Sequence, residues 1–358
     1  MKIGSLVLDF PVVQAALSGY SDLAMRRIAR RHGAVYTFGE VVLDRIALAP
    51  VGKARRTMDP APDDHPIGGQ LIGSEPEDMA RAADAMVQAG YDGIDINFAC
   101  PVPKVLGRRR GGYLLSQPDA ALRILREVHQ AVAGRRPITV KMRRGLDCSD
   151  PSDRRFFTIL DGAFEIGIDA VTVHPRTVRQ RYVGPSDWSF LTRVKRHVGD
   201  RVVLGSGDLF CAEDVVRMID RTGVDGVALA RGCIGNPWIF RDCRALLAGL
   251  PAPAAPTVPE QGETIAQHLA WSIEIHGERR ACRIMRKFGI KYSELHPHWI
   301  QVRNAFVRTR SRQDWQAILA RWYDPHGNWH GSKTGTHLRA TLDYDPENGF
   351  RRGACPRF

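Results

Sequence analysis

Cys100 and Lys141 are the two side chains of this sequence whose surroundings best suit chemistry. Cys100 follows an apolar run ending near Asn97 and precedes Pro101, which fixes the turn. A thiol with an ordinary pKa near ~8.5 stays largely protonated at neutral pH, so it can act as a general acid without a metal. Lys141 lies inside another apolar run, where an ammonium group implies an anion or an electron-rich ring opposite it. Alone, a cysteine is more often a small buried hydrophobe and a lysine a solvated charge.

Other polar residues end further apolar runs. Gln70 could pair with an amide-bearing ring such as a flavin, although a capped strand end is an equally good interpretation of this residue alone. Glycines and charges follow the last two runs, where backbone amides and a nearby cation commonly bind phosphate. The segment from Gly205 is not a dinucleotide fingerprint, because it lacks the third glycine and the acidic partner. The candidate phosphate residues are Gly205, Gly207, Asp208, Ala230 and Arg231.

The elements that must position these residues are parallel βα units. Short β-branched apolar runs alternate with amphipathic segments of helical period. Eight such units in roughly 250 residues predict an α/β fold, a (β/α)8 TIM barrel, with its active site at the C-terminal ends of the strands. The predicted strands are 12–16, 34–38, 67–72, 93–97, 138–142, 170–174, 202–205 and 226–230. The predicted helices are 21–31, 75–88, 119–133, 154–165, 187–198, 212–221 and 237–247, with Ser21, Ser74 and Ser186 as N-caps and a weak signal after the second strand.

A proline-rich stretch marks the end of the barrel. Residues 249–260 contain too many prolines for a helix or a central strand, so they predict a linker after a catalytic barrel of residues 1–248. Apolar residues then recur at helical spacing, which predicts a small all-α helical domain over residues 261–325. Residues 326–358 predict a C-terminal loop or tail.

Positive charge gathers in the predicted helical domain. The 358 residues carry 51 Lys and Arg against 39 Asp and Glu, a formal net charge of +12, and ten basic residues but one acid lie between residues 279 and 312. This asymmetry favours a polyanionic partner. Arg279, Arg283 and Arg286 would form one stripe on a helix. A solvated helix face is the usual alternative for such a stripe.

The cysteines and the hydropathy indicate a compartment. Seven cysteines, an odd number without any CxxC pair, argue against a disulfide framework and a zinc ribbon, so we expect a reducing environment and no metal. No stretch approaches the ~20 apolar residues that span a bilayer. The sequence therefore predicts a cytoplasmic protein without a membrane partner.

Taken together, these motifs resemble the bacterial, FMN-dependent tRNA-dihydrouridine synthases. The matching residues occur in order over most of residues 12–295. They are Asn97, Cys100, Pro101, Gly111, Gly112, Leu114, Leu115, Lys141, Arg143, His174, Arg176, Thr177, Tyr182, Gly184, Asp187, Trp188, Arg231, Gly232, Gly235, Asn236 and Pro237. The sequence departs from the family pattern at Ala16, Leu17, Ala99, Pro175 and Ser206, which touch flavin contacts and the shape of the pocket.

The resemblance implies a mechanism and a site. NADPH, or NADH, would reduce FMN, the flavin would deliver hydride to C6 of a uracil in tRNA, and Cys100 would donate the proton to C5. The implied cofactor-binding residues are Ala16, Leu17, Gln70, Lys141, His174, Gly205, Gly207, Asp208, Ala230 and Arg231. The implied substrate-binding residues are Glu40, Asn97, Arg143, Arg176, Arg279, Arg283 and Arg286. Neither DNA nor an obligate protein partner is expected.

Three alternatives stay open. The same chemistry could act on ribosomal RNA. A flavin barrel that reduces a small molecule, similar to dihydroorotate dehydrogenase or old yellow enzyme, would explain the barrel but not the basic helical domain. A non-catalytic RNA-binding protein would explain that domain but not Cys100, Lys141 and Arg231 together.

Overall fold

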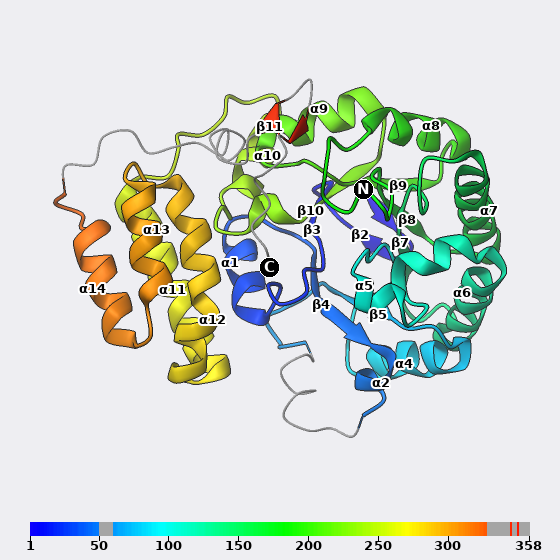
Figure 1. The fold of residues 1–358 in the computed structure, drawn as a ribbon, viewed down its shortest axis with the longest axis horizontal. Helices are drawn as coiled ribbons and strands as arrows, with labels where there is room; N and C mark the ends of the chain where they lie inside the picture. The colour runs from blue at the N-terminus through cyan, green and yellow to red at the C-terminus, as the bar shows by residue number, and fades with distance from the viewer. Residues whose placement is uncertain (50–59, 328–343, 346–348, 351–358) are drawn as a thin grey trace. The chain divides into compact units, whose positions relative to one another are not determined.

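Eight parallel strands form a closed barrel in the order β10-β3-β4-β5-β6-β7-β8-β9 (Figure 1). The computed structural model of the chain describes residues 1–49, 60–327, 344–345 and 349–350. Every residue of β5 and β6 is buried, as expected for parallel strands covered on both faces. The predicted barrel is thereby confirmed. Its strands are β3 (Val12–Gln14), β4 (Thr37–Leu43), β5 (Ile67–Ile72), β6 (Gly93–Phe98), β7 (Ile138–Arg143), β8 (Ala170–His174), β9 (Val202–Gly205) and β10 (Gly226–Leu229).

Helices alternate with these strands along the chain. Of those drawn in Figure 1, α4, α6, α7 and α8 lie outside the strands. Two 3-10 helices, η1 (Gly111–Ser116) and η2 (Arg231–Cys233), follow the strands β6 and β10. The α-helices up to the proline-rich stretch are α1 (Leu23–Arg31), α2 (Asp44–Ala47), α4 (Pro76–Gln88), α5 (Pro103–Leu106), α6 (Pro118–Val132), α7 (Asp150–Ile166), α8 (Trp188–Val198), α9 (Ala212–Thr222) and α10 (Ile239–Leu247).

The second barrel strand lies several residues later than predicted. Gly39 and Glu40 interrupt the apolar pattern, so the sequence places the strand at 34–38, before them. The chain instead forms β4 across both residues, with a shift in its register against β5 between Phe38 and Val41. A bulge of this kind accommodates the interrupted pattern within one strand. The weak helical signal that follows corresponds to the short α2, and residues 50–59 lie outside the described residues.

Three helices have their N-cap one residue later than predicted. Asp22 caps α1 by accepting a hydrogen bond from the Met25 N–H, whereas the hydroxyl of Ser21 donates to the carbonyl of Gly39. An aspartate beside a serine is an equally good cap, so the sequence alone does not separate them. The N-caps of α4 and α8 are likewise Glu75 and Asp187, rather than Ser74 and Ser186.

Two short hairpins lie near the ends of the chain. The strands β1 (Lys2–Ile3) and β2 (Leu6–Val7) pair before the barrel, and the strands β11 (Tyr344–Asp345) and β12 (Gly349–Phe350) pair within the predicted tail. The rest of that tail from residue 328 onward, including Cys355, lies outside the described residues. Within the described part of the chain, no helix has both the length and the apolar character needed to cross a membrane.

The chain divides into two compact units. The first consists of residues 1–21, 35–208 and 217–229, and it contains the eight barrel strands. The second consists of residues 22–34, 209–216 and 230 onward, so α1 and α10 group with the C-terminal helices. The predicted domain boundaries at residues 248, 260 and 325 stay a prediction.

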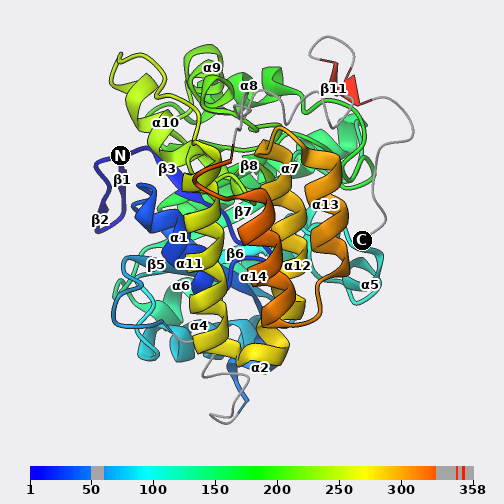
Figure 2. The same ribbon diagram turned by 90° about the vertical axis from the view of Figure 1, so that its left-hand side faces the viewer.

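The second unit has its own core of helices, which lie side by side in Figure 2. Phe306 and Trp315 are fully buried with ring centroids 4.9 Å apart, and the Trp315 Nε1 donates to the carbonyl of Cys282. Gly289 permits close approach, because a Cβ there would lie 2.7 Å from the Phe306 ring. The helices are α11 (Val258–His276), α12 (Glu278–Tyr292), α13 (Trp299–Arg308) and α14 (Arg312–Trp322), with the 3-10 helix η3 (Ser293–Leu295) after α12.

Candidate active site

A buried hydrogen-bond network crosses β5, β6 and β7 at the predicted site. Gln70 Nε2 donates to Asp95 Oδ2, and Thr139 Oγ1 donates to Asp95 Oδ1, both at 2.6 Å. Asn97 Nδ2 donates to Gln70 Oε1 at 2.7 Å. The strand register sets Gln70 beside Asp95 and Asn97 beside Lys141. Because hydrogen bonds are stronger in a buried, low-dielectric setting, this network fixes the Asn97 side chain in one orientation.

The backbone around Cys100 is held from three directions. Asn97 Oδ1 accepts from the N–H groups of Ala99 at 2.9 Å and Cys100 at 3.0 Å. The Gly112 N–H donates to the Cys100 carbonyl at 3.0 Å. Arg143 Nε donates to the Ala99 carbonyl at 2.9 Å. The backbone that carries the half-buried thiol therefore has a fixed position at the C-terminal end of β6.

Two further features of Cys100 follow from its surroundings. Burial raises the pKa of its thiol, and a backbone hydrogen bond at Val102 and the charge of Arg143 offset only part of this. The thiol is therefore protonated at neutral pH and can donate a proton. Gly111 has a φ of +58° and packs against Cys100, since a Cβ at Gly111 would lie 2.9 Å from the Cys100 Cβ.

Lys141 is a half-buried cation within β7. Burial and the charge of Arg143 lower its pKa to about 8, against the opposing attraction of Asp95. Burial also raises the pKa of Asp95 to about 6, while hydrogen bonds from Thr139 and Gln70 and the charge of Lys141 act in the opposite direction. Lys141 makes no hydrogen bond or close ion pair with another residue in the part of the chain that the structure describes. Its ammonium group can therefore donate a hydrogen bond to an acceptor atom of a bound molecule.

Arg143 joins two loops of the barrel rim. Besides Ala99 in the loop after β6, its guanidinium reaches the loop after β8, where Nη1 donates to the carbonyls of Thr177 at 3.0 Å and Arg181 at 2.7 Å. It also lies 5.6 Å from the centre of the Tyr182 ring. Arg143 is buried, and its hydrogen bonds to these carbonyls position the loop that carries Cys100.

Arg176 and Asp208 form a fully buried ion pair. Arg176 Nη2 contacts both carboxylate oxygens of Asp208, at 2.8 and 2.7 Å, and Arg176 Nε donates to the Gly184 carbonyl. The Ser186 N–H donates to Asp208 Oδ2 at 2.8 Å. The pair thereby ties the loop after β8 to the loop after β9. Arg176 Nη1 has no hydrogen-bond partner among the described residues, and the predicted ligand contacts of both side chains stay a prediction.

We expect Asp208→Ala to lower the free energy of unfolding by about 3–5 kcal/mol, because it leaves the buried Arg176 charge without its partner. Urea denaturation measures this change. Asp84→Ala is the control, since Asp84 pairs with Arg135 at 2.6 Å where both side chains are more than one-third exposed. An exposed pair contributes about 0–1 kcal/mol. Equal effects of the two substitutions would contradict a stabilising role for the buried pair.

His174 and the segment after β9 lie against each other. The Nδ1 of His174 is 3.3 Å from the Ser206 hydroxyl oxygen. Gly207 has a φ of +108°, and a Cβ there would lie 3.0 Å from the His174 ring. A Cβ at Gly205 would lie 2.6 Å from the sulfur of Met218. Gly207 therefore suits the close packing of the rim, whereas Gly205 suits the packing of β9 against α9.

The remaining predicted residues lie on other segments. Ala16 and Leu17 follow β3 and Glu40 lies within β4, and all three are half-buried. Ala230 and Arg231 follow β10 in the chain and belong to the second unit, where the Arg231 guanidinium lies 5.3 Å from the centre of the Phe210 ring. Arg279, Arg283 and Arg286 all lie on α12.

Sequence reasoning missed Asp95, Thr139 and Gln14. Asp95 interrupts the apolar run of β6, and a buried carboxylate in such a run needs hydrogen-bond partners, so this signal was present in the sequence. Gln14 ends β3 and is fully buried, and its Oε1 has no hydrogen-bond partner among the described residues. It offers a further acceptor within the barrel.

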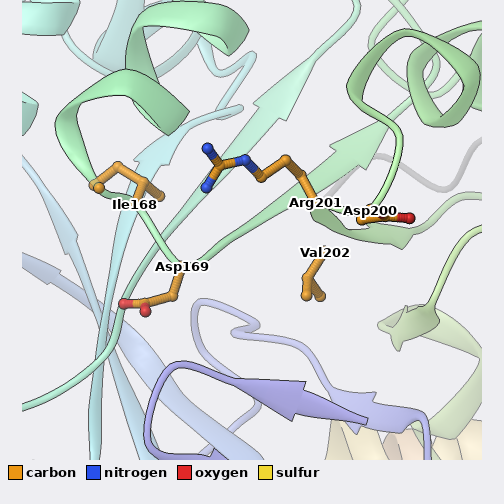
Figure 3. A pocket seen from close by; sticks show the side chains of 6 residues that line it. Ile168, Asp169, Asp200, Arg201 and Val202 are labelled. Carbon is orange, nitrogen blue, oxygen red and sulfur yellow. The ribbon is translucent and has the colours of Figure 1, made fainter.

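A cavity of about 270 Å³ lies away from these residues, at the N-terminal ends of β8 and β9 (Figure 3). The Asp169 carboxylate on its wall already accepts a hydrogen bond from the Ile138 N–H at 2.8 Å. In a (β/α)8 barrel this end contributes to stability rather than to catalysis. The lining residues are Gly167, Ile168, Asp169, Asp200, Arg201 and Val202.

Solved structures share the fold of this chain at low sequence identity. A dihydroorotate dehydrogenase structure from Eimeria tenella, in complex with ferulenol, has a TM-score of 0.51 at 16% identity and covers 69% of this chain and 83% of its own. Histamine dehydrogenase from Rhizobium sp. 4-9 has a TM-score of 0.52 at 14% identity and covers 75% of this chain, which in turn spans 50% of that enzyme. Similarities at these identities concern the fold alone.

Sequence relatives are closer. A probable tRNA-dihydrouridine synthase from Mycobacterium tuberculosis strain H37Rv is 33% identical over 90% of this chain and 84% of its own length. The tRNA-dihydrouridine synthase B of Xanthomonas axonopodis pv. citri is 32% identical over 90% of this chain and 95% of its own length. The family profile described as dihydrouridine synthase (Dus) matches residues 13–321, which include the barrel and the helices up to α14. With the Cys100 site at the barrel rim, this match over most of its length makes the chain a member of the dihydrouridine synthase family.

Proposed function

We propose that this protein reduces uridines in tRNA to 5,6-dihydrouridine, with FMN as its flavin, NADPH as the reductant and Cys100 as the proton donor. The observation that carries the proposal is the protonated, half-buried Cys100, whose backbone is fixed by Asn97, Arg143 and Gly112. The names of the relatives in Mycobacterium tuberculosis and Xanthomonas support tRNA as the substrate.

The residues of the barrel rim fit a flavin. Lys141, which has no hydrogen bond within the described residues, would donate to an acceptor atom of the flavin ring. Gln70 also supports Asn97, so its predicted contact with the ring would use its remaining hydrogen-bonding capacity. Arg231 and the amides of Gly205 and Gly207 follow the last two strands, where barrels commonly bind phosphate. When bound, FMN would supply the hydride for C6 of the uracil, and NADPH or NADH would return the flavin to its reduced form.

The protein itself supplies the proton and the geometry. The Cys100 thiol donates its proton to C5 of the uracil, on a loop that Asn97 and Arg143 hold in place. A stacked base has to be extruded from the RNA to reach that thiol, which costs a few kcal/mol. Phosphate contacts from the basic stripe of α12, defined as Arg279, Arg283 and Arg286, would offset this cost.

The direct test uses purified protein, FMN and NADPH with unmodified tRNA and, separately, with ribosomal RNA. Mass spectrometry of the digested RNA detects the two added hydrogens of dihydrouridine. We expect the product in tRNA. Product in ribosomal RNA alone would change the substrate but not the chemistry. Reduction of orotate or another small molecule without any RNA product would contradict the proposal.

We expect the purified protein to be yellow with noncovalent FMN. Arg231→Ala should weaken FMN retention, because it removes a cation predicted to bind the phosphate. Measuring FMN release by fluorescence after gel filtration compares the two proteins. Arg155→Ala is the control, since Arg155 is exposed on α7 and should leave retention unchanged. Protein that stays colourless after reconstitution with FMN would contradict the flavin assignment.

A further inference from the structure

Two arginines at the barrel rim have a left-handed backbone. Arg109, in the loop after β6, has a φ of +57°, and Arg181, in the loop after β8, has a φ of +52°. A side chain makes this conformation unfavourable, so glycine usually occupies it. Among the described residues other than glycine, only Ala133 and Asp208 share it. Asp208 is held by its ion pair with Arg176, whereas Ala133 ends α6.

The fold gives no reason for arginine at either rim position. Arg109 and Arg181 are both exposed, and neither side chain has a hydrogen bond or ion pair with another residue in the described ranges. The contact that Arg143 makes with Arg181 uses its backbone carbonyl, which any residue supplies. Neither guanidinium group therefore forms a polar contact within the described residues that would offset its unfavourable backbone conformation.

The surroundings of both arginines have the character of a contact surface. Lys104 and Arg108 are exposed near Arg109. These two loops also hold three of the seven large hydrophobic side chains that are exposed among the described residues. These side chains are Val102 at 44%, Tyr182 at 42% and Val183 at 62%.

The two loops are fixed to each other beside Cys100. Arg143 bridges them through the carbonyls of Ala99 and Arg181. Gly112 also packs directly on Val178, since a Cβ at Gly112 would lie 2.6 Å from the Val178 side chain. The loops therefore form one positive rim next to the proton donor.

We propose that Arg109 and Arg181 bind backbone phosphates of the substrate RNA at the mouth of the active site, an inference that rests on the proposed function. A guanidinium group binds phosphate with paired, charge-assisted hydrogen bonds, so two of them can hold the nucleotides that flank an extruded base. The unfavourable backbone is then retained because the side chains contact RNA rather than the protein.

The experiment replaces each arginine with the residue that its backbone favours. Arg109→Gly, Arg181→Gly and the double variant are made in the full-length chain, and melting temperature is measured beside tRNA affinity by fluorescence anisotropy at several salt concentrations. We expect melting temperatures at or above that of the unmodified protein. Each single substitution should weaken tRNA binding about 10-fold. In the double variant the salt dependence of log K should become shallower by about two units.

Ala133→Gly is the matched control. It makes the same backbone change at the end of α6, at the opposite end of the barrel strands from Cys100, and should leave tRNA affinity unchanged. If the folded double variant has the same tRNA affinity and salt dependence as the unmodified protein, the proposed rim contacts are wrong. The proposed function would stand, because the unmodified protein would still bind and reduce tRNA. If the unmodified protein neither binds nor reduces any RNA, the proposed function fails, and the rim contacts with it.

Discussion

Cys100→Ala is expected to lower the rate of dihydrouridine formation by about 10²- to 10⁴-fold, the usual effect of removing a general acid. The substitution removes only the thiol, and the backbone contacts from Asn97 and Arg143 remain possible. Flavin content should therefore be retained. Single-turnover kinetics with tRNA measure the rate, and absorbance measures the flavin. Cys148→Ala is the control, because Cys148 is exposed in the loop after β7 and should react at the unmodified rate.

The pH dependence of the same reaction gives a second measurement. A general acid acts in its protonated form, and burial raises the pKa of Cys100. The part of the alkaline decline that depends on Cys100 should therefore lie above the ordinary pKa of a thiol, whereas loss of the Lys141 proton near pH 8 affects the unmodified protein and Cys100→Ala alike. Full activity of Cys100→Ala, or an identical decline above the pKa range of Lys141 in that variant, would show that Cys100 is structural.

Most of the barrel could be predicted because its strands are buried on both faces. The strands β5, β8 and β9 have the predicted bounds, since each is a short apolar run between turn residues. The strand β4 could not be placed in this way. Its bulge depends on pairing with β5, a contact between distant segments that local composition does not report.

The site was predictable in its location but not in its hydrogen bonds. Polar residues at the C-terminal ends of parallel strands meet at one rim, so Asn97, Cys100 and His174 could be placed there from the sequence. Which side chains pair depends on strand register and on loop conformation. The sequence therefore treated Arg176 and Asp208 as separate ligand contacts, although they lie 2.7 Å apart as a buried pair. The roles of these residues in catalysis came from the resemblance to the family, because the positions of the side chains do not define them.

Charge reversal of the α12 stripe is expected to abolish RNA modification. In Arg279→Glu, Arg283→Glu and Arg286→Glu combined, three cations that would bind phosphates become anions that repel them. Arg279 and Arg283 are exposed and Arg286 is half-buried, and none has an ion pair within the described residues. The opposite face of α12 packs through residues that the substitutions do not change. These are Ala281, Cys282, Met285, Phe288, Gly289 and Tyr292. The fold and the flavin content should therefore be retained.

Salt dependence separates phosphate contacts from a general effect of net charge. Each phosphate contact contributes about 0.9 to the slope of log K against log salt concentration, so losing three should make the slope shallower by nearly three units. The control reverses Arg123, Arg126 and Arg155, which are exposed on α6 and α7, and lowers the net charge by the same amount. We expect the control to keep most of its tRNA affinity and its slope. If the α12 variant binds tRNA like the control, the stripe is a solvated helix face. The search for the phosphate contacts then moves to the exposed arginines beside Cys100, which are Arg108, Arg109 and Arg181.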